Sequence, residues 1–177
     1  MNVLIGITGS ISAYKACDVI QGLKATGNIV KVVMTPSSLK FCPIEAVAIL
    51  SKNVVMVTAP ENDGIVHHVV LSDWCDKFVI VPASYNTIGK IINGIADNLL
   101  TEICAVIQKP KYIFPAMNTN MLEKCHLEKL EGWHVSETAY GILACGAKGQ
   151  GKLLKPRAIV EIINGVKASQ IKKISIS

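Results

Sequence analysis

The chain of 177 residues and 19.0 kDa is long enough for one domain with a full hydrophobic core. Hydrophobic residues make up 50% of it, yet no run reaches the roughly 18 unbroken apolar residues of a membrane span, so we do not expect a transmembrane protein. The net charge is +5, and many of the basic residues lie in the C-terminal part of the chain without aromatic residues between them. This pattern argues against a nucleic-acid partner. The basic residues form either a solvated surface and tail or a positively charged lip for a phosphorylated substrate.

The cysteines and the first residues indicate a reducing compartment. None of the six cysteines forms a Cys-x-x-Cys pair, so we expect neither a disulfide framework nor a metal site. Met1 leads straight into an apolar stretch without a basic segment, so we expect no signal peptide and a cytoplasmic protein.

Apolar strand-like runs alternate with helical patterns along the chain. We expect strands at 3–5, 29–34, 54–57, 78–81 and 111–114, and a short segment near 134–135. We expect helices ending near residue 24 and over 43–50, 87–93, 98–107, 120–130 and 158–164, with a helical or mixed element at 67–74. Residues 136–157 predict a long loop. Residues 1–166 then form a single domain, and residues 167–177 form a loose basic tail.

This alternation predicts the fold class. Successive βαβ units give a three-layer α/β/α, Rossmann-like architecture around a parallel sheet. In such folds, ligands bind just beyond the carboxyl ends of the strands. The polar segments that directly follow the predicted strands are therefore the candidate binding loops.

Hydroxyl-rich turns follow the first two predicted strands. Gly9, Ser10 and Ser12 precede a helix, where backbone N–H groups and hydroxyls attract a phosphate; an ordinary tight turn is the alternative. Thr35 and Ser37 follow the second strand. Two such turns at neighbouring strand ends suit a mononucleotide better than a dinucleotide.

A third polar loop follows the strand at 78–81. It contains Pro82, Ala83, Ser84, Asn86 and Thr87. Its small residues would let a flat ring system approach the backbone, while simple capping of the next helix is the alternative.

Three further places carry side chains suited to chemistry. His67 and His68 are possible general bases, and we expect one of the two to be structural. Asn118 follows the strand at 111–114, where its carboxamide can bind a carboxylate or merely cap a helix, with Met121 as an apolar neighbour. Cys145 lies among glycines, so we expect an exposed thiol on a mobile loop.

Taken in order, these segments identify a family. The chain resembles the flavin-containing cysteine decarboxylases from about Val3 to about Leu154. The motifs that carry the resemblance are Gly6-Ile-Thr-Gly-Ser-Ile-Ser-Ala-Tyr-Lys15, His68-Val-Val-Leu-Ser-Asp-Trp-Cys-Asp76, Pro82-Ala-Ser-Tyr-Asn-Thr87, Gly94-Ile-Ala-Asp-Asn-Leu-Leu100, Pro115-Ala-Met-Asn118 and the Cys145 loop.

The resemblance implies a cofactor, an assembly and site residues. The cofactor is FMN, and the assembly is a homotrimer or a multiple of trimers with active sites between subunits. The implied catalytic residues are His68, Asn118 and Cys145, with His68 preferred over His67 because the family motif is His-x-x-Leu. The implied substrate-binding residues are Asn118, Met121, Ala144 and Lys152, and Phe41 joins the cofactor-binding residues named above.

The implied reaction converts 4′-phosphopantothenoylcysteine to 4′-phosphopantetheine in coenzyme A biosynthesis. It proceeds through thiol oxidation, loss of carbon dioxide and re-reduction of the enethiol, with Cys145 as proton donor. Two alternatives stay open. One is a lantibiotic-type decarboxylase of peptidyl cysteine, which stops at the enethiol; the other is a non-catalytic FMN-binding regulatory protein.

Overall fold

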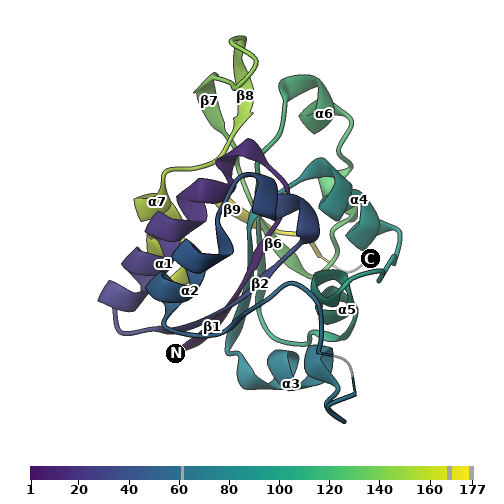
Figure 1. Cartoon of the computed structure of the whole chain (residues 1–177). Helices are drawn as coiled ribbons and strands as arrows, with labels where there is room; N and C mark the ends of the chain where they lie inside the picture. The colour runs from purple at the N-terminus through teal and green to yellow at the C-terminus, as the bar shows by residue number, and fades with distance from the viewer. Residues whose placement is uncertain (61, 167–168, 176–177) are drawn as a thin grey trace.

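A seven-stranded sheet forms the middle layer of the molecule (Figure 1). The computed structural model describes residues 1–60, 62–166 and 169–175. The strand order is β3-β2-β1-β4-β5-β6-β9, and all pairs are parallel except β6 with β9. These strands are β1 (Asn2–Ile7), β2 (Ile29–Met34), β3 (Val55–Met56), β4 (Lys77–Ala83), β5 (Lys111–Pro115), β6 (Trp133–Ser136) and β9 (Ile171–Lys173).

The central strands are apolar on both faces because helices cover both sides. Val3, Leu4 and Ile5 of β1 are fully buried, as are all residues from Phe78 to Val81 of β4. Such continuous apolar runs are typical of parallel strands inside a three-layer fold.

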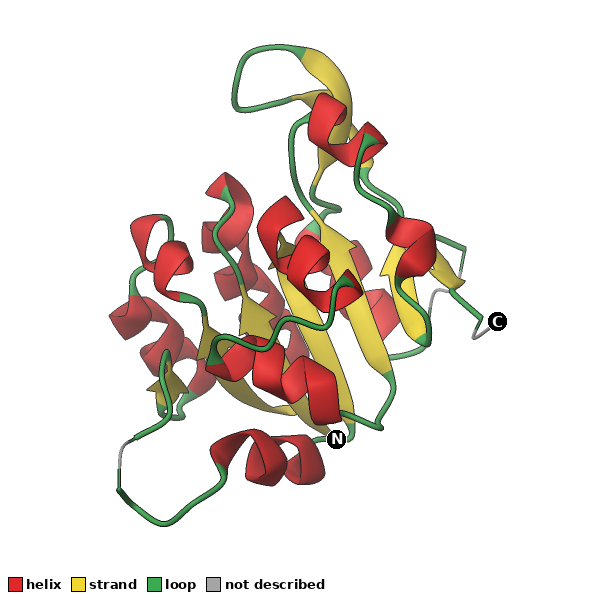
Figure 2. Cartoon of the chain, turned by 90° about the vertical axis from the view of Figure 1, so that its right-hand side faces the viewer, coloured by secondary structure: helices red, strands yellow, loops and turns green. Residues whose placement is uncertain are grey.

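Helices pack on the two faces of the sheet (Figure 2). One face carries α1 (Ala16–Ala25), α2 (Ile44–Ser51) and α7 (Pro156–Ile163). The other carries α3 (His67–Trp74), α4 (Tyr85–Ile92) and α5 (Leu99–Val106). Short 3-10 helices are η1 (Ile11–Lys15), η2 (Pro36–Lys40) and η3 (Leu127–Lys129). The predicted three-layer α/β/α fold with a parallel sheet is confirmed.

The expected long loop over 136–157 is wrong. This segment contains an antiparallel hairpin of β7 (Ala139–Ile142) and β8 (Lys148–Lys152), which projects beyond the carboxyl ends of the sheet (Figure 1). The sequence of the hairpin is rich in glycine and shows no alternation of apolar and polar residues. Backbone hydrogen bonds between β7 and β8 hold the two strands together without such a pattern.

The expected single helix over 120–130 is also wrong. The chain forms the short helix α6 (Thr119–Glu123) and then η3. Between them the chain turns so that Cys125 enters the apolar core, where Leu130 is also buried. The break in the helix allows both side chains to be buried in the core.

The segment expected as a loose tail contributes a strand. Ile171–Lys173 pairs antiparallel with β6, with Ser136 opposite Ile171 and His134 opposite Lys173. The parts of this tail at 167–168 and 176–177 lie outside the described residues. The domain boundary at residue 166 stays a prediction.

Candidate functional site

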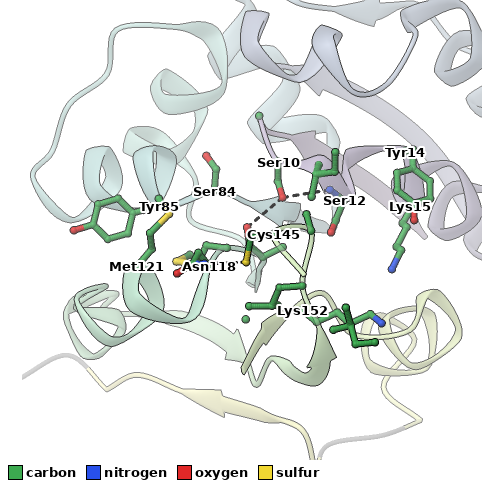
Figure 3. Close-up of a pocket in the computed structure, with 18 residues that line it drawn as sticks. Ser10, Ser12, Tyr14, Lys15, Ser84, Tyr85, Asn118, Met121, Cys145 and Lys152 are labelled. Carbon is green, nitrogen blue, oxygen red and sulfur yellow. Dashed lines mark hydrogen bonds between the residues drawn. The ribbon is translucent and has the colours of Figure 1, made fainter. Parts of the chain in front are cut away.

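A cavity of about 570 Å³ opens at the carboxyl ends of the strands. Its walls come from the segments that follow β1, β4 and β5 and from the β7–β8 hairpin (Figure 3). The predicted site residues that line it are Gly9, Ser10, Ser12, Ser84, Asn118, Met121, Ala144, Cys145 and Lys152. A cavity of this size suits a small ligand or cofactor.

Hydroxyl groups join the loops that form the cavity walls. Thr8 Oγ1 donates a hydrogen bond to the carbonyl oxygen of Pro82 (2.8 Å) and accepts one from the backbone N–H of Ser84 (2.8 Å). Ser10 Oγ donates to the carbonyl oxygen of Ala116 (3.2 Å). The ends of β1, β4 and β5 are thereby held at fixed spacing.

Asn118 serves the fold and the cavity at once. Its Oδ1 accepts a hydrogen bond from the backbone N–H of Asn120 (2.9 Å) and so caps α6. Its Nδ2 donates to Sγ of Cys145 (3.5 Å) and faces the cavity. The cap is therefore confirmed, and binding of a carboxylate by the Nδ2 end of the side chain stays a prediction.

Cys145 lies in a hydrogen-bonded turn between β7 and β8. The backbone N–H of Leu143 donates to the carbonyl oxygen of Ala147 (2.8 Å), and that of Gly146 donates to the carbonyl oxygen of Leu143 (2.9 Å). Gly146 has a φ of 84°, which favours glycine. The turn presents Cys145 as an exposed thiol.

The other five cysteines are buried or half-buried. Burial raises the pKa of Cys75 and Cys125 to about 11, and burial together with Cys17 raises that of Cys42 to about 12. These thiols stay protonated at neutral pH and belong to the core. The exposed thiol is thus the one placed for chemistry.

The hairpin is attached directly to the segment after β5. The backbone N–H of Met117 donates to the carbonyl oxygen of Gly151 (3.0 Å), and Thr119 Oγ1 donates to that of Gln150 (2.6 Å). A Cβ at Gly151 would lie 2.1 Å from the Met117 carbonyl oxygen, and the Gly151 φ is 118°. A glycine is therefore required where the two backbones meet.

The wall formed by the loops after β1 and β4 carries groups that suit a flavin mononucleotide. The loop after β1 packs directly on the loop after β2, because a Cβ at Gly9 would lie 2.5 Å from Ser37 Oγ. Ser10, Ser12 and Ser84 supply neutral hydroxyl groups beside small and apolar residues. Hydroxyls and backbone N–H groups suit a phosphate, and the small residues leave room for a flat ring.

Other predicted cofactor-binding residues lie behind this wall. Thr35 is buried; its hydroxyl lies 3.2 Å from Ser37 Oγ and donates to the carbonyl oxygen of Ile7 (3.5 Å). Phe41, 38% exposed, follows η2. Neither Thr35, Ser37 nor Phe41 lines the cavity. Their contact with a cofactor stays a prediction.

The loop after β4 divides between core and surface. Pro82 and Ala83 are buried within β4, and Thr87 is buried where its backbone N–H donates to Ser84 Oγ (3.4 Å). Asn86 is exposed. Of the five predicted residues in this loop, Ser84 lines the cavity and also caps α4, and its contact with a ligand stays a prediction.

His68 lies away from this cavity. It belongs to α3, which lies at the opposite end of the molecule from the hairpin (Figure 1). Its Nδ1 is 3.4 Å from Oε2 of Glu102 on α5, and its side chain is 31% exposed. One chain therefore brings Asn118 and Cys145 together but does not bring His68 to them.

His67 has structural partners. Its Nε2 lies 2.6 Å from Oδ2 of Asp63, and its side chain is 9% exposed. Hydrogen bonds from the Ile65 backbone N–H and from His67 hold the pKa of Asp63 below its usual value. The pair fixes the loop that leads into α3.

Several lining residues were not predicted. They are Ile11, Tyr14, Lys15, Tyr85, Ala116, Met117, Ile142, Leu143 and Gly151. Tyr14 and Lys15 are the last residues of the first sequence motif, and Ile142 and Leu143 directly precede Cys145. Their closeness in sequence to these motifs is the signal that could have identified them as lining residues. The hairpin that brings Ile142 and Gly151 to the cavity had no apolar pattern to reveal it.

Two features are absent from the described residues. No group of three or more His, Cys, Asp or Glu side chains is placed to hold a metal ion there. No helix of that part of the chain has the length and apolarity to cross a membrane.

The sequence matches a family model. The model described as Flavoprotein covers residues 1–167. The chain is similar to the coenzyme A biosynthesis bifunctional protein CoaBC of Bacillus subtilis (strain 168), with 36% identity over 169 residues, which span 91% of this chain and 42% of that protein. It is also similar to a probable phosphopantothenoylcysteine decarboxylase of Streptococcus mutans, with 34% identity across 91% of this chain and 96% of that protein.

Solved structures give the same result. A PPC decarboxylase mutant complexed with pantothenoylaminoethenethiol has a TM-score of 0.81 and 30% identity, covering 92% of this chain and 96% of that one. The FMN-binding protein AtHal3 has a TM-score of 0.76 and 31% identity, covering 96% and 97%. The epidermin biosynthesis protein EpiD of Staphylococcus aureus has a TM-score of 0.75 and 29% identity, covering 92% and 99%.

Proposed function

The chain belongs to the flavoprotein family, and we propose that it is an FMN-dependent phosphopantothenoylcysteine decarboxylase. It converts 4′-phosphopantothenoylcysteine to 4′-phosphopantetheine and carbon dioxide in coenzyme A biosynthesis. The chain spans 42% of the length of the Bacillus subtilis bifunctional relative, so the proposal concerns the decarboxylation alone. The observation that carries it is the pair of Asn118 and Cys145, 3.5 Å apart in a cavity at the carboxyl end of the sheet.

FMN is the cofactor. Gly9, Ser10, Ser12 and Ser84 would hold it, because the three serines line the cavity with hydroxyls and Gly9 lets their loop pack closely on Ser37. Bound FMN supplies two-electron redox chemistry at the cysteine end of the substrate.

The residues of this chain act on the substrate from the cavity walls. Asn118 Nδ2 donates to the carboxylate and orients it for departure as carbon dioxide. The Cys145 thiol would deliver the proton for reduction of the enethiol, with the two electrons returned from the cofactor, so that the saturated thiol is released. Met121 packs against the substrate as an apolar wall.

His68 acts in a site shared between copies of the chain. It assists oxidation of the substrate thiol, either as the base that takes the thiol proton or as a group that orients the thiol. Valines 66, 69 and 70 around it are 56%, 39% and 51% exposed, an apolar surface that a second copy would cover. We infer a homotrimer or a multiple of trimers, working in the cytoplasm.

The test is product analysis with the purified protein. Supplied with FMN and 4′-phosphopantothenoylcysteine, it should form 4′-phosphopantetheine, detected by mass spectrometry. A peptide ending in cysteine serves as the competing substrate. Preference for that peptide, or release of the enethiol alone, would support the lantibiotic-type decarboxylase, and flavin binding without turnover of either substrate would support a regulatory protein.

A further inference from the structure

The lining of the cavity is positively charged. Lys15 and Lys152 line it, and none of its 18 lining residues is an aspartate or glutamate. The remaining polar groups, Ser10, Ser12 and Asn118 among them, are neutral at pH 7. A cavity with two cations and no carboxylate attracts an anion.

Both ammonium groups are free of partners within the described residues. The ion pairs of that part of the chain use Lys90, Arg157 and three histidines. Its lysine side-chain hydrogen bonds start from Lys24, Lys77 and Lys90. Lys15 Nζ lies 5.8 Å from the centre of the Tyr14 ring. Neither Lys15 nor Lys152 is committed to holding the fold together.

The two lysines reach the cavity from different elements. Lys15 ends η1, the turn that also carries Ser12, and Lys152 ends β8 next to Gly151, which is hydrogen-bonded to Met117. In Figure 3, Lys15 lies at one end of the labelled residues and Tyr85 and Met121 lie toward the other, with Cys145 between them. The cationic end of the cavity is thus distinct from the end where Asn118 faces Met121 (Figure 3).

We infer that Lys15 and Lys152 bind the phosphate of the substrate and select phosphorylated over unphosphorylated pantothenoylcysteine. The inference rests on the proposed function, because that substrate carries a carboxylate at its cysteine end and a phosphate at the other. Asn118 takes the first anion, and the two lysines take the second. Charge-assisted hydrogen bonds to phosphate are strong enough for each lysine to contribute about tenfold in affinity.

The kinetic test compares two substrates. We expect Lys15→Gln and Lys152→Gln each to lower kcat/KM for 4′-phosphopantothenoylcysteine about tenfold and to leave that for pantothenoylcysteine nearly unchanged. The control is Lys155→Gln, which removes an exposed charge at the start of α7, outside the cavity lining. Equal losses with both substrates, or an equal loss in the control, would overturn the inference.

A binding test needs no turnover. On the FMN-loaded protein, calorimetry should show 4′-phosphopantetheine binding about tenfold more weakly to each lysine variant, with pantetheine unaffected. FMN and riboflavin affinities, followed by flavin fluorescence, should be unchanged in the variants. Weaker FMN binding with unchanged riboflavin binding would assign the lysines to the cofactor phosphate and overturn the inference.

The two proposals fail differently. If the wild-type protein decarboxylates neither form of pantothenoylcysteine and binds neither form of pantetheine, the proposed function is wrong. If it decarboxylates both forms equally well, the function stands and the assignment of Lys15 and Lys152 is wrong.

Discussion

The two ends of the molecule carry the candidate catalytic groups in different ways. At the carboxyl end of the sheet, Asn118 and Cys145 touch inside a cavity that a single chain encloses. On α3, His68 lies outside that cavity, beside Glu102 and exposed valines. One chain thus brings together the two groups proposed to act on the carboxylate and on the product carbon. The candidate base points outward, as expected for a site completed by a second copy.

Assemblies that mix two variant chains give the largest expected effect and test whether the site is shared between copies. His68→Asn should lower formation of 4′-phosphopantetheine by about 10²–10⁴-fold with FMN still bound, and His67→Asn should change it little. Co-assembling His68→Asn chains with Cys145→Ser chains should restore part of the activity, because some sites then combine an intact His68 with an intact Cys145. Activity no higher than that of the separate variants would contradict a shared site.

The Cys145→Ser variant tests the role of the thiol in the cavity. The variant should still release carbon dioxide, but formation of the saturated thiol should fall about 100-fold or more, because serine is a far weaker proton donor than cysteine. Mass spectrometry should find the enethiol in its place. Full yield of 4′-phosphopantetheine would exclude Cys145 as the proton donor.

Asn118 variants separate the cap from the chemistry. Asn118→Asp keeps an oxygen for the Asn120 backbone N–H but places a negative charge where we propose that the substrate carboxylate binds. We expect kcat/KM to fall about 100-fold while Tm stays unchanged. Asn118→Ala should also lower the free energy of unfolding by about 1 kcal/mol through loss of the cap. Unchanged kcat/KM in the aspartate variant would exclude carboxylate binding by Asn118.

The joint between the hairpin and the sheet gives a smaller effect, measured as stability. Gly151→Ala should lower the free energy of unfolding by about 1–3 kcal/mol, since its positive φ is strained for alanine and its Cβ would meet the Met117 carbonyl. Gly141→Ala is the matched control in the same hairpin, where a Cβ makes ordinary contacts with Lys152. Equal effects in urea unfolding would show that the close approach does not hold the hairpin.

The smallest expected effect concerns the edge of the sheet far from the cavity. Burial, with Lys173 and Lys77 nearby, lowers the pKa of His134, which stacks on Tyr112. The neutral form is favoured in the folded state, so this stability is present above about pH 6.5 and is lost as the pH falls below it. Tm should drop by no more than about 2 °C between pH 7.5 and 5.5. His134→Phe should remove that part of the drop, and an identical drop in the variant would contradict the assignment.

The sequence predicted the sheet well because parallel strands buried on both faces are continuous apolar runs. The segments Val3–Ile5 and Phe78–Val81 both lie fully inside the sheet. The sequence did not predict the β7–β8 hairpin, because its glycine-rich strands pair through backbone hydrogen bonds and show no apolar pattern. It also missed β9, whose three residues carry two exposed lysines and pair only through the fold.

The site was predictable where residues follow strands directly. Ser10, Ser84 and Asn118 all come within a few residues of a strand end, and the fold brings them to one cavity. Lys15 was missed because it lies a full turn beyond the loop, and its direction depends on η1. The position of His68 relative to Cys145 depends on tertiary and quaternary arrangement, which no local pattern encodes.

The Thr8 hydroxyl fixes the spacing between the loops after β1 and β4 on the cavity wall. This spacing depends on the hydrogen bonds of the Thr8 side chain rather than on the volume of that side chain. The hydroxyl gives its proton to the Pro82 carbonyl and receives one from the Ser84 amide, so it must be both donor and acceptor. Valine has the same shape but would leave both backbone groups unpaired in a buried place, whereas serine satisfies both at the loss of a methyl group. Among substitutions at this position, a slightly smaller alcohol is therefore tolerated and an isosteric hydrocarbon is not.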